Sequence, residues 1–302
     1  MIYVISKEES GKTVKEILRF DIGLSLAFTK QLKFLDGGII LNGEHVTVRK
    51  TVCEGDVLEL ATEDLEQTDL CPANIPVSVI FEDEYMILPN KPANMPTHPS
   101  HNHRGDTLAD ALAYKYQQEE KPFVFRAISR LDRNTSGILL IAKDRISASK
   151  LSKSMKNGEF EKQYIAILDG HPKDDCGIID TYIKREAESI IFRKVCGKDE
   201  GGDHAVTEYK ILAKSENHSL VLALPKTGRT HQLRVHFAHI GAPILGDDLY
   251  GKPSDKIDRH ALHAYSLTFP HPMTQKSVTY KAPLNDDMEK LTFKLFNGYS
   301  FV

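Results

Sequence analysis

The sequence contains no tryptophan and only four cysteines among 302 residues. The cysteines Cys53, Cys71, Cys176 and Cys196 are widely spaced and form no C-x-x-C pair. The sequence therefore lacks the usual half of a zinc site and the usual redox motif. We interpret the four residues as buried thiols of a protein in a reducing compartment, and we expect that compartment to be the cytoplasm.

Long apolar runs are absent as well. The longest, such as residues 138–142, have five residues, whereas a membrane span needs about 20. The apolar start of the chain is followed at once by Lys7, Glu8 and Glu9, which is unlike a signal peptide. With 41% hydrophobic and 27% charged residues, the composition is that of an ordinary globular protein, and we expect no membrane partner.

The chain has no overall excess of basic residues. Its 39 Lys and Arg are balanced by 42 Asp and Glu, and the formal net charge is −3, which argues against binding nucleic acid through bulk charge. The local charge differs. Residues 121–150 contain seven basic residues and two acids, and residues 217–246 contain no acid. These two segments have the positive charge expected of a site that binds phosphates.

The first sixty residues predict a small α-α-β module. A capping box at Thr13 begins one short helix, and the apolar spacing over residues 28–35 predicts a second, ended by the glycine pair 37–38. Asn42-Gly43 then predicts a β-hairpin. Residues 62–76 are acidic, polar and contain two prolines, as in a linker.

We place a domain boundary near residue 70, which gives domains at 1–70 and 71–302. In the second domain, strand-like stretches alternate with amphipathic helices, and no internal repeat is found, so we expect the α+β class. Strands are expected at residues 77–81, 137–142, 164–168 and 219–224. Helices are expected to begin at Asp106, to run from Asp144 to Gly158, and to run from Thr230 to Gly241.

The stretch R-L-D-R-N-T-S-G, residues 130–137, is a polar turn that leads into a predicted strand. One interpretation makes Asp132 a turn-forming residue paired with Arg130 or Arg133. The other makes it a functional carboxylate, which nearby guanidinium groups keep ionised. An ionised carboxylate suits a nucleophile or a base.

A second polar stretch reads T-G-R-T-H-Q-L-R-V-H-F-A-H and is predicted to begin a helix whose first turn carries Arg229 and His231. Helix N-termini bind anions, and arginine adds bidentate recognition of phosphate. Because His231 and Arg234 share a face of this helix, Arg234 could point at a carboxylate of another segment. The alternatives are plain surface polarity and a metal site of His231, His236 and His239, which lacks the H-E-x-x-H pattern.

Two other patterns do not support a site. We interpret His98, His101 and His103 as part of a proline-bounded loop. Ser129 and Ser136 lack the G-x-S-x-G context of a hydrolase nucleophile.

Several segments resemble, in order, the motifs of the RluA-type pseudouridine synthases. Residues 130–143 resemble the family signature, residues 91–100 its first motif, and K-Q-Y-I-A at 162–166 its tyrosine motif. Residues 227–251 resemble the third motif, and A-L-H-A at 261–264 the closing segment. The first sixty residues resemble the RNA-binding domain named after ribosomal protein S-four.

This resemblance implies a pseudouridine synthase fold, with a mixed, largely antiparallel β-sheet flanked by helices and a small N-terminal RNA-binding domain. It implies that uridine in RNA, ribosomal RNA first and transfer RNA next, is converted to pseudouridine. The base is cut from its sugar, rotated and rejoined through carbon 5, without a metal, a nucleotide or another cofactor. We expect a monomer.

The resemblance makes Asp132 the essential carboxylate and Arg234 the arginine that salt-bridges it. Tyr164 corresponds to the tyrosine that stacks on the target base, although an ordinary strand aromatic remains an alternative. Departure of the base builds positive charge at the anomeric carbon, which an ionised carboxylate stabilises. Covalent attack by Asp132 and abstraction of a sugar proton are both compatible with this role.

The target uridine must leave its stack to reach Asp132. Arg130 is expected to fill the resulting gap or to hold a phosphate, and Leu262 to pack the floor of the pocket. The implied substrate-binding residues are Arg130, Arg229, His231 and Leu262, with phosphate as the partner of Arg229 and His231. The candidates for RNA binding in the first domain are Lys30 and Lys33, unless they form a solvated helix face.

Three positions depart from the family pattern. Ser129 stands where many relatives have histidine, and Leu26 where a basic residue is frequent. Asn94 stands where glycine is common, and asparagine tolerates the left-handed conformation. A catalytically inactive RNA-binding protein is the alternative function, but the joint presence of Asp132, Tyr164 and Arg234 argues against it. A nucleosidase-type hydrolase would have no need of the RNA-binding module.

Overall fold

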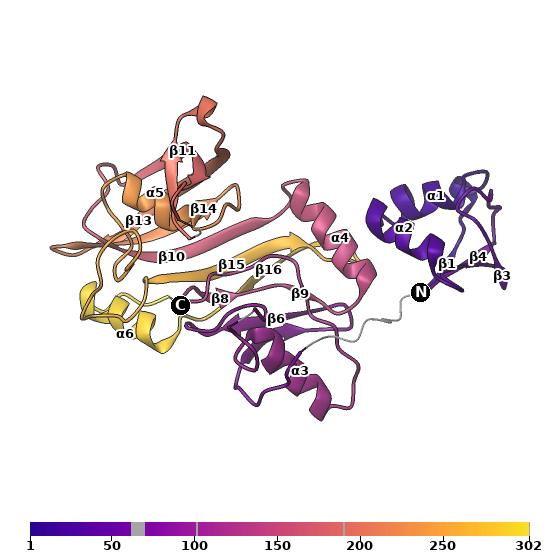
Figure 1. Cartoon of the computed structure of the whole chain (residues 1–302), viewed down its shortest axis with the longest axis horizontal. Helices are drawn as coiled ribbons and strands as arrows, with labels where there is room; N and C mark the ends of the chain where they lie inside the picture. The colour runs from indigo at the N-terminus through magenta and orange to yellow at the C-terminus, as the bar shows by residue number, and fades with distance from the viewer. Residues whose placement is uncertain (62–69, 101, 190, 302) are drawn as a thin grey trace.

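The computed structural model describes residues 1–61, 70–100, 102–189 and 191–301. It contains a small N-terminal sheet and one large sheet with helices packed around it (Figure 1). Residues 62–69 of the predicted linker and His101 of the predicted histidine loop lie outside the described residues.

The N-terminal sheet is antiparallel, in the order β1-β4-β2-β3. The predicted hairpin is confirmed, because Asn42 and Gly43 both have positive φ, 51° and 83°, as its tight turn requires. The first strand was not predicted, since it is short and lies at the edge of the sheet. The strands are β1 (Ile2–Val4), β2 (Ile39–Leu41), β3 (Glu44–His45) and β4 (Val57–Leu60).

The two predicted N-terminal helices are present. Helix α1 (Val14–Glu16) begins with the predicted capping box, in which the Glu16 amide donates to Thr13 Oγ1 and the Thr13 amide donates to Glu16 Oε2. It continues as a π-helical turn, η2 (Ile17–Asp21). Helix α2 (Leu26–Phe34) ends before Leu35, which has extended backbone, so the predicted helix was slightly too long.

The large sheet is mixed and largely antiparallel, as predicted. Its main order is β12-β11-β13-β14-β10-β15-β8-β6-β9-β7, with β16 on β15 and β5 on β6. Among the described strands, only β8 and β15 pair in parallel. The strands are β5 (Ser78–Glu82), β6 (Met86–Lys91), β7 (Arg126–Ala127), β8 (Ser136–Ile138), β9 (Ile141–Ala142), β10 (Glu161–Asp169), β11 (Cys176–Arg185), β12 (Arg193–Cys196), β13 (Asp203–Lys214), β14 (His218–Pro225), β15 (Leu262–Pro270) and β16 (Ser277–Lys281).

The predicted strand over residues 137–142 is wrong in one respect, because the chain forms two strands there. Strand β8 pairs with β15 and with one end of β6, whereas β9 pairs with β7 and with the other end of β6. The whole run is buried. A continuous apolar run contains no signal for the point at which its pairing changes, so the sequence could not show the break.

The helices of the large domain are α3 (Leu108–Gln118), α4 (Arg145–Lys156), α5 (Gln232–His239) and α6 (Asp286–Leu295). Asp144 caps α4 as predicted. Helix α3 begins two residues after the predicted Asp106, since Thr107 is its cap and the Asp106 carboxylate pairs with His103 instead.

Helix α4 connects the two parts of the molecule. Its Ile146 belongs to the buried cluster of the N-terminal module, and Ser149 Oγ accepts a hydrogen bond of 2.5 Å from the Ser25 amide. Figure 1 shows this module beside α4, with β11 and β13 at the other end of the molecule.

The four cysteines are free, and none is buried, which corrects the prediction of buried thiols. Cys53 lies in a turn, and Cys196 ends the edge strand β12. The general tendency of cysteine toward burial does not hold at turns and sheet edges, where little packs over the side chain. Within the described ranges, no helix is long and apolar enough to cross a membrane.

Three buried histidines predict that the protein loses stability in mild acid. Burial lowers the pKa of His236 and His263 to about 4 and that of His260 to about 3. Unfolded histidine titrates near its ordinary pKa of about 6.5, so below that pH the unfolded chain binds more protons than the folded one. We expect the melting temperature to be highest above about pH 6.5 and to fall progressively toward pH 4. A melting temperature that stays constant from about pH 7 to pH 4.5 in calorimetry would contradict this expectation.

Candidate active site

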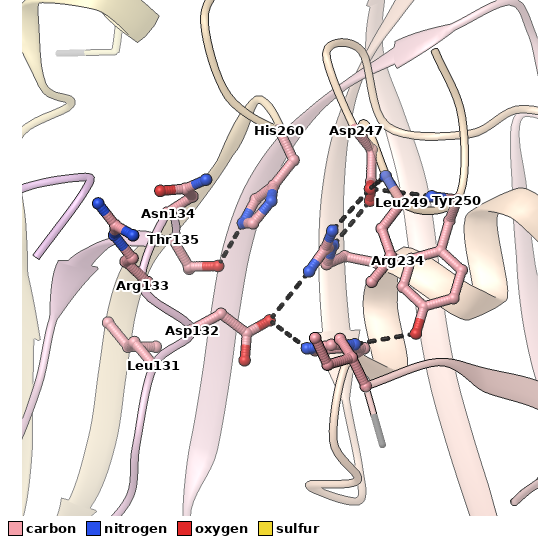
Figure 2. Close-up of polar contacts among 12 residues, drawn as sticks. Leu131, Asp132, Arg133, Asn134, Thr135, Arg234, Asp247, Leu249, Tyr250 and His260 are labelled. Carbon is pink, nitrogen blue, oxygen red and sulfur yellow. Dashed lines mark hydrogen bonds and ion pairs between the residues drawn. The ribbon is translucent and has the colours of Figure 1, made fainter. Parts of the chain in front are cut away.

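Asp132 lies on the loop between β7 and β8, near the middle of the large sheet, and its side chain is 32% exposed. The residues around it hold the loop in place. The Leu131 carbonyl accepts from Thr97 Oγ1 at 3.0 Å, and the Thr135 amide donates to the Asp132 carbonyl at 3.1 Å. Thr135 Oγ1 contacts His260 Nε2 at 2.8 Å (Figure 2). The loop is therefore anchored through its neighbours, and the Asp132 carboxylate is left accessible.

The loop ends where the chain enters β8, and Gly137 is the second residue of that strand. This residue has φ +114°, and a Cβ added there would lie 2.2 Å from the Ala264 carbonyl oxygen of β15. No other residue fits this approach without moving the backbone. The glycine thus fixes the point at which the Asp132 loop joins the parallel strand pair.

Lys91 stabilises the Asp132 loop through hydrogen bonds of its side chain. Its side chain is fully buried, and its Nζ donates to the carbonyls of Pro92, Met95 and Arg133 at 2.8 to 3.0 Å. Burial, together with the charge of Arg259, lowers the pKa of Lys91 to about 7. The sequence prediction included Lys91 in a motif without assigning it a contact. The structure shows that it ties that motif to the residue after Asp132.

Arg259 also stabilises the Asp132 loop, through hydrogen bonds of its guanidinium. Its guanidinium donates to the Asn134 carbonyl at 3.1 Å, to Ser136 Oγ at 3.2 Å and to the Leu262 carbonyl at 3.2 Å. Asp287 of α6 pairs with the same guanidinium at 2.7 and 3.0 Å. Arg259 was missed because a single arginine in a polar stretch has no periodic signal. It connects α6 and β15 to the Asp132 loop.

The structure brings Asp132 together with His231 and Arg234. His231 Nε2 lies 3.9 Å from Asp132 Oδ2. Arg234 Nη1 lies at the same distance from this oxygen (Figure 2). These distances allow ion pairing but are longer than a hydrogen bond. The alternative pairing is not seen: among the described residues, neither Arg130 nor Arg133 forms an ion pair with Asp132, and both are exposed.

The closest partner of Arg234 is Asp247. The guanidinium donates two hydrogen bonds of 2.7 Å to this carboxylate, which is fully buried (Figure 2). Burial acts to raise the pKa of Asp247, but the hydrogen bonds and charge of Arg234 outweigh it and lower the pKa. The prediction that Arg234 approaches Asp132 is therefore refined, because Asp247 fixes Arg234 and leaves only Nη1 for Asp132.

Tyr164 lies on β10 and packs against both buried clusters of the large domain. Burial raises the pKa of the Tyr164 phenol, and the negative charge of Asp132 raises it further. The phenol therefore lies within the field of the Asp132 carboxylate and is held in its neutral form.

The predicted helix over residues 230–241 is shorter than expected, since α5 begins at Gln232. His231 precedes it with left-handed backbone, φ +57° and ψ +17°, and the Arg229 amide donates to Gln232 Oε1 at 3.0 Å. This amide is therefore not free for an anion, while phosphate binding by the Arg229 side chain and by His231 stays a prediction. The glutamine side chain reaches back three residues to a backbone amide, as in the second half of a capping box, and the sequence prediction did not use this contact.

The histidines of the metal alternative are separated by their contacts. His236 is buried between Thr181 and Thr207, with distances of 3.0 and 2.9 Å. Throughout the described part of the chain, no group of three or more His, Cys, Asp or Glu side chains is arranged to hold a metal ion.

The remaining predicted residues lie around this centre or away from it. Leu262 is buried in the core at the start of β15, and Arg130 is exposed on the Asp132 loop. Arg229 is exposed, and it lines a polar cavity of about 360 Å³ beside β11 and β12. Lys184, Arg185 and Arg193 line the same cavity as Arg229. Lys30 and Lys33 are exposed on α2, in the N-terminal module.

Comparison with known proteins places this mixed sheet, with a carboxylate on its central loop and an arginine fixed beside it, in the class of the RNA-modifying isomerases. The chain belongs to the RNA pseudouridylate synthase family, whose sequence profile matches residues 85–239. This confirms the resemblance to RluA-type synthases and makes the protein an RNA pseudouridine synthase, an enzyme that acts on RNA.

Relatives of known name agree. An uncharacterized RNA pseudouridine synthase of Bacillus subtilis, YjbO, is 37% identical over 281 residues, which are 92% of this chain and 98% of that protein. Ribosomal large subunit pseudouridine synthase D of Blochmanniella floridana is 33% identical, covering 85% of this chain and 86% of its own. The structure of human RNA pseudouridylate synthase domain containing 1 is 27% identical, with a TM-score of 0.60 over 72% of this chain and 87% of that one.

Proposed function

We propose that this pseudouridine synthase acts through Asp132 and that its substrate is a uridine of large-subunit ribosomal RNA. One observation carries the assignment of the site. The Asp132 carboxylate stands on a loop fixed from both sides, accessible to a substrate, with Arg234 and His231 each 3.9 Å away. The name of the related synthase D supports the choice of ribosomal RNA over transfer RNA.

The proposed reaction divides its work among these residues. The bond between C1′ and N1 of uridine breaks, a bond between C1′ and C5 forms, N1 gains a proton, and C5 loses one. Positive charge that develops at C1′ is stabilised by the Asp132 carboxylate. Tyr164 supplies a flat apolar surface for the base, and Leu262 packs behind the site. Arg234, which Asp247 holds in place, keeps a guanidinium at the carboxylate.

The choice of RNA is tested with transcripts that carry tritium at C5 of uridine, because formation of the new bond releases that hydrogen. We expect the purified protein to release tritium from large-subunit ribosomal RNA faster than from a transfer RNA pool. Faster release from transfer RNA would overturn the ribosomal assignment without affecting the isomerase class.

We also propose that residues 1–70 comprise an S-four-like RNA-binding domain and a linker, and residues 71–302 the catalytic domain. The separate sheet and separate buried cluster of residues 1–61 support this division. Lys30 and Lys33 lie exposed on α2 next to exposed apolar side chains such as Phe34, a combination that suits phosphate and base contacts. We further propose that the protein is a monomer in the cytoplasm. Sedimentation of the purified chain tests the monomeric state.

RNA phosphates are proposed to lie on the positive surface beside the active site, with Arg229 and Arg130 among their partners. Lys162 of β10 belongs to the same surface, since its Nζ would be 3.8 Å from a Cβ added at Gly228. Burial lowers the pKa of Lys162, and among the described residues its ammonium has no ion-pair or hydrogen-bond partner. A half-buried cation without a counter-charge favours an incoming anion.

Lys162→Gln is therefore expected to weaken RNA binding and to reduce the salt dependence of affinity. The slope of log K against log salt should fall by about 1, since one phosphate contact is lost. The measurement is the affinity for a labelled transcript of large-subunit ribosomal RNA between about 50 and 200 mM salt. Lys290→Gln on α6 is the matched control, because that side chain is 81% exposed and far along the chain from the site. An equal slope in both variants would remove Lys162 from the RNA contact.

A further inference from the structure

His231 is held between two groups. Its Nε2 lies 3.9 Å from Asp132 Oδ2, and its Nδ1 lies 2.9 Å from the hydroxyl of Tyr250. The residue has left-handed backbone, which is uncommon for a residue other than glycine and is maintained here by these surroundings. The ring is therefore fixed in a direction that presents Nε2 to the carboxylate.

The hydrogen bonds of Tyr250 determine which nitrogen of His231 carries the proton. The Tyr250 hydroxyl accepts from the Arg193 amide at 3.0 Å. Its own hydrogen has one acceptor in reach among the described residues, which is His231 Nδ1. When the hydroxyl donates to Nδ1, the neutral imidazole must carry its hydrogen on Nε2. That hydrogen points to Asp132.

A single turn behind the site holds both groups that face Asp132. Asp247 accepts from the amides of Leu249 and Tyr250 at 3.0 and 3.1 Å, while its carboxylate also holds Arg234 (Figure 2). The guanidinium of Arg234 lies 5.1 Å from the centre of the Tyr250 ring. The turn over residues 247–250 thus positions Arg234 directly and His231 through Tyr250.

We propose that Tyr250 is a positioning residue for the isomerisation, which holds His231 as the Nε2–H tautomer and directs that hydrogen at the Asp132 carboxylate. The inference rests on the proposed function, in which Asp132 is the reacting group. In this arrangement Nδ1 of His231 is hydrogen-bonded to Tyr250, and Nε2 faces Asp132 at 3.9 Å. The partner of His231 is then Asp132 rather than an RNA phosphate, and phosphate binding falls to Arg229 and Lys162.

The charged and titratable groups around His231 are Asp132, Arg234, Arg193, Asp247, Tyr250 and His260. Burial lowers the pKa of His231, and the positive charges of Arg234 and Arg193 lower it further. The negative charge of Asp132 acts in the opposite direction. The Tyr250 hydroxyl adds to the lowering, since a donor to Nδ1 stabilises the neutral ring. Tyr250→Phe removes that donor and leaves the other groups unchanged, so the pKa of His231 should rise.

The first test needs no RNA. Two-bond proton–nitrogen spectra of the full chain labelled with ¹⁵N-histidine report the tautomer of each ring, and His231→Gln identifies the His231 signal by its loss. We expect the Nε2–H tautomer in the wild type, and in Tyr250→Phe a mixture of tautomers with a higher pKa. An Nδ1–H tautomer in the wild type, or an unchanged His231 signal in Tyr250→Phe, would overturn the proposal.

The second test measures turnover. Tyr250→Phe should lower kcat about tenfold on tritiated large-subunit ribosomal RNA, with little change in KM, and should move the acid limb of the pH profile upward. Tyr182→Phe on β11 is the control, since its ring contacts His204 and not the site. If Asp132→Asn is inactive but Tyr250→Phe matches the control, this inference fails while the proposed function stands. If Asp132→Asn is active, the proposed function fails instead.

Discussion

Replacing Asp132 by asparagine is expected to slow pseudouridine formation by at least about 10³-fold. Asparagine keeps the shape of the side chain but cannot carry the negative charge that stabilises the sugar as the base departs, and it cannot act as a nucleophile or base. RNA affinity should change little, because the carboxylate contributes no phosphate contact. The measurement is tritium release from C5 of labelled large-subunit ribosomal RNA by the purified variant, alongside its affinity for the same transcript.

Asp169→Asn provides the matched control. Asp169 is exposed at the end of β10, the strand that carries Tyr164, and the same change there should leave the rate as in the wild type. Equal rates for Asp132→Asn and Asp169→Asn would remove Asp132 from the chemistry.

Asp247→Ala is expected to lower the free energy of unfolding by about 3 to 5 kcal/mol. The fully buried Asp247 carboxylate pairs with Arg234 through two hydrogen bonds and accepts two further backbone amides. Its removal leaves the buried guanidinium without its hydrogen-bonded counter-charge, with only the carboxylates of Asp132 and Asp248 at 3.9 Å, and releases the turn that holds Tyr250. Urea unfolding of both proteins measures the change, and activity should fall with it because Arg234 is no longer fixed at Asp132.

Asp248, next to Asp247 in the chain, provides the control for this prediction. Asp248 also lies 3.9 Å from Arg234, but its side chain is 75% exposed and solvent screens the pair, so Asp248→Ala should cost less than about 1 kcal/mol. If the two alanine variants unfold at the same urea concentration, the buried pair does not have the structural role assigned to it here.

Local signals in the sequence were sufficient where a few neighbouring residues decide the structure. The capping box at Thr13, the turn at Asn42-Gly43 and the cap at Asp144 depend on contacts within three or four residues, and all three are confirmed. The left-handed backbone expected to be tolerated at Asn94 is found there, with φ +60°. In each case the residue type itself favours the observed conformation.

Errors arose where distant residues decide. The break between β8 and β9 depends on which end of β6 each strand meets. The start of α5 is a different case, because the contact of Gln232 with the Arg229 amide is local and was overlooked. The exposure of the cysteines depends on their places at turns and edges. None of these can be read from hydrophobic spacing.

The site shows the same division. Asp132, Arg234 and His231 were predicted, and the structure brings them together. The residues that hold them, Asp247 and Tyr250 behind the site and Lys91 and Arg259 around the loop, act through contacts with residues far away in the chain. Their residue types suit many roles, so only the fold identifies which carboxylate is buried against which arginine.

The most direct test of the central claim is a pseudouridine map of ribosomal and transfer RNA from the source strain without this gene, complemented with the wild-type gene or with Asp132→Asn. We predict that at least one pseudouridine of large-subunit ribosomal RNA is missing in the deletion strain. The wild-type gene should restore it, and Asp132→Asn, expressed at the same level, should not. Restoration by Asp132→Asn, or identical maps with and without the gene, would contradict the account.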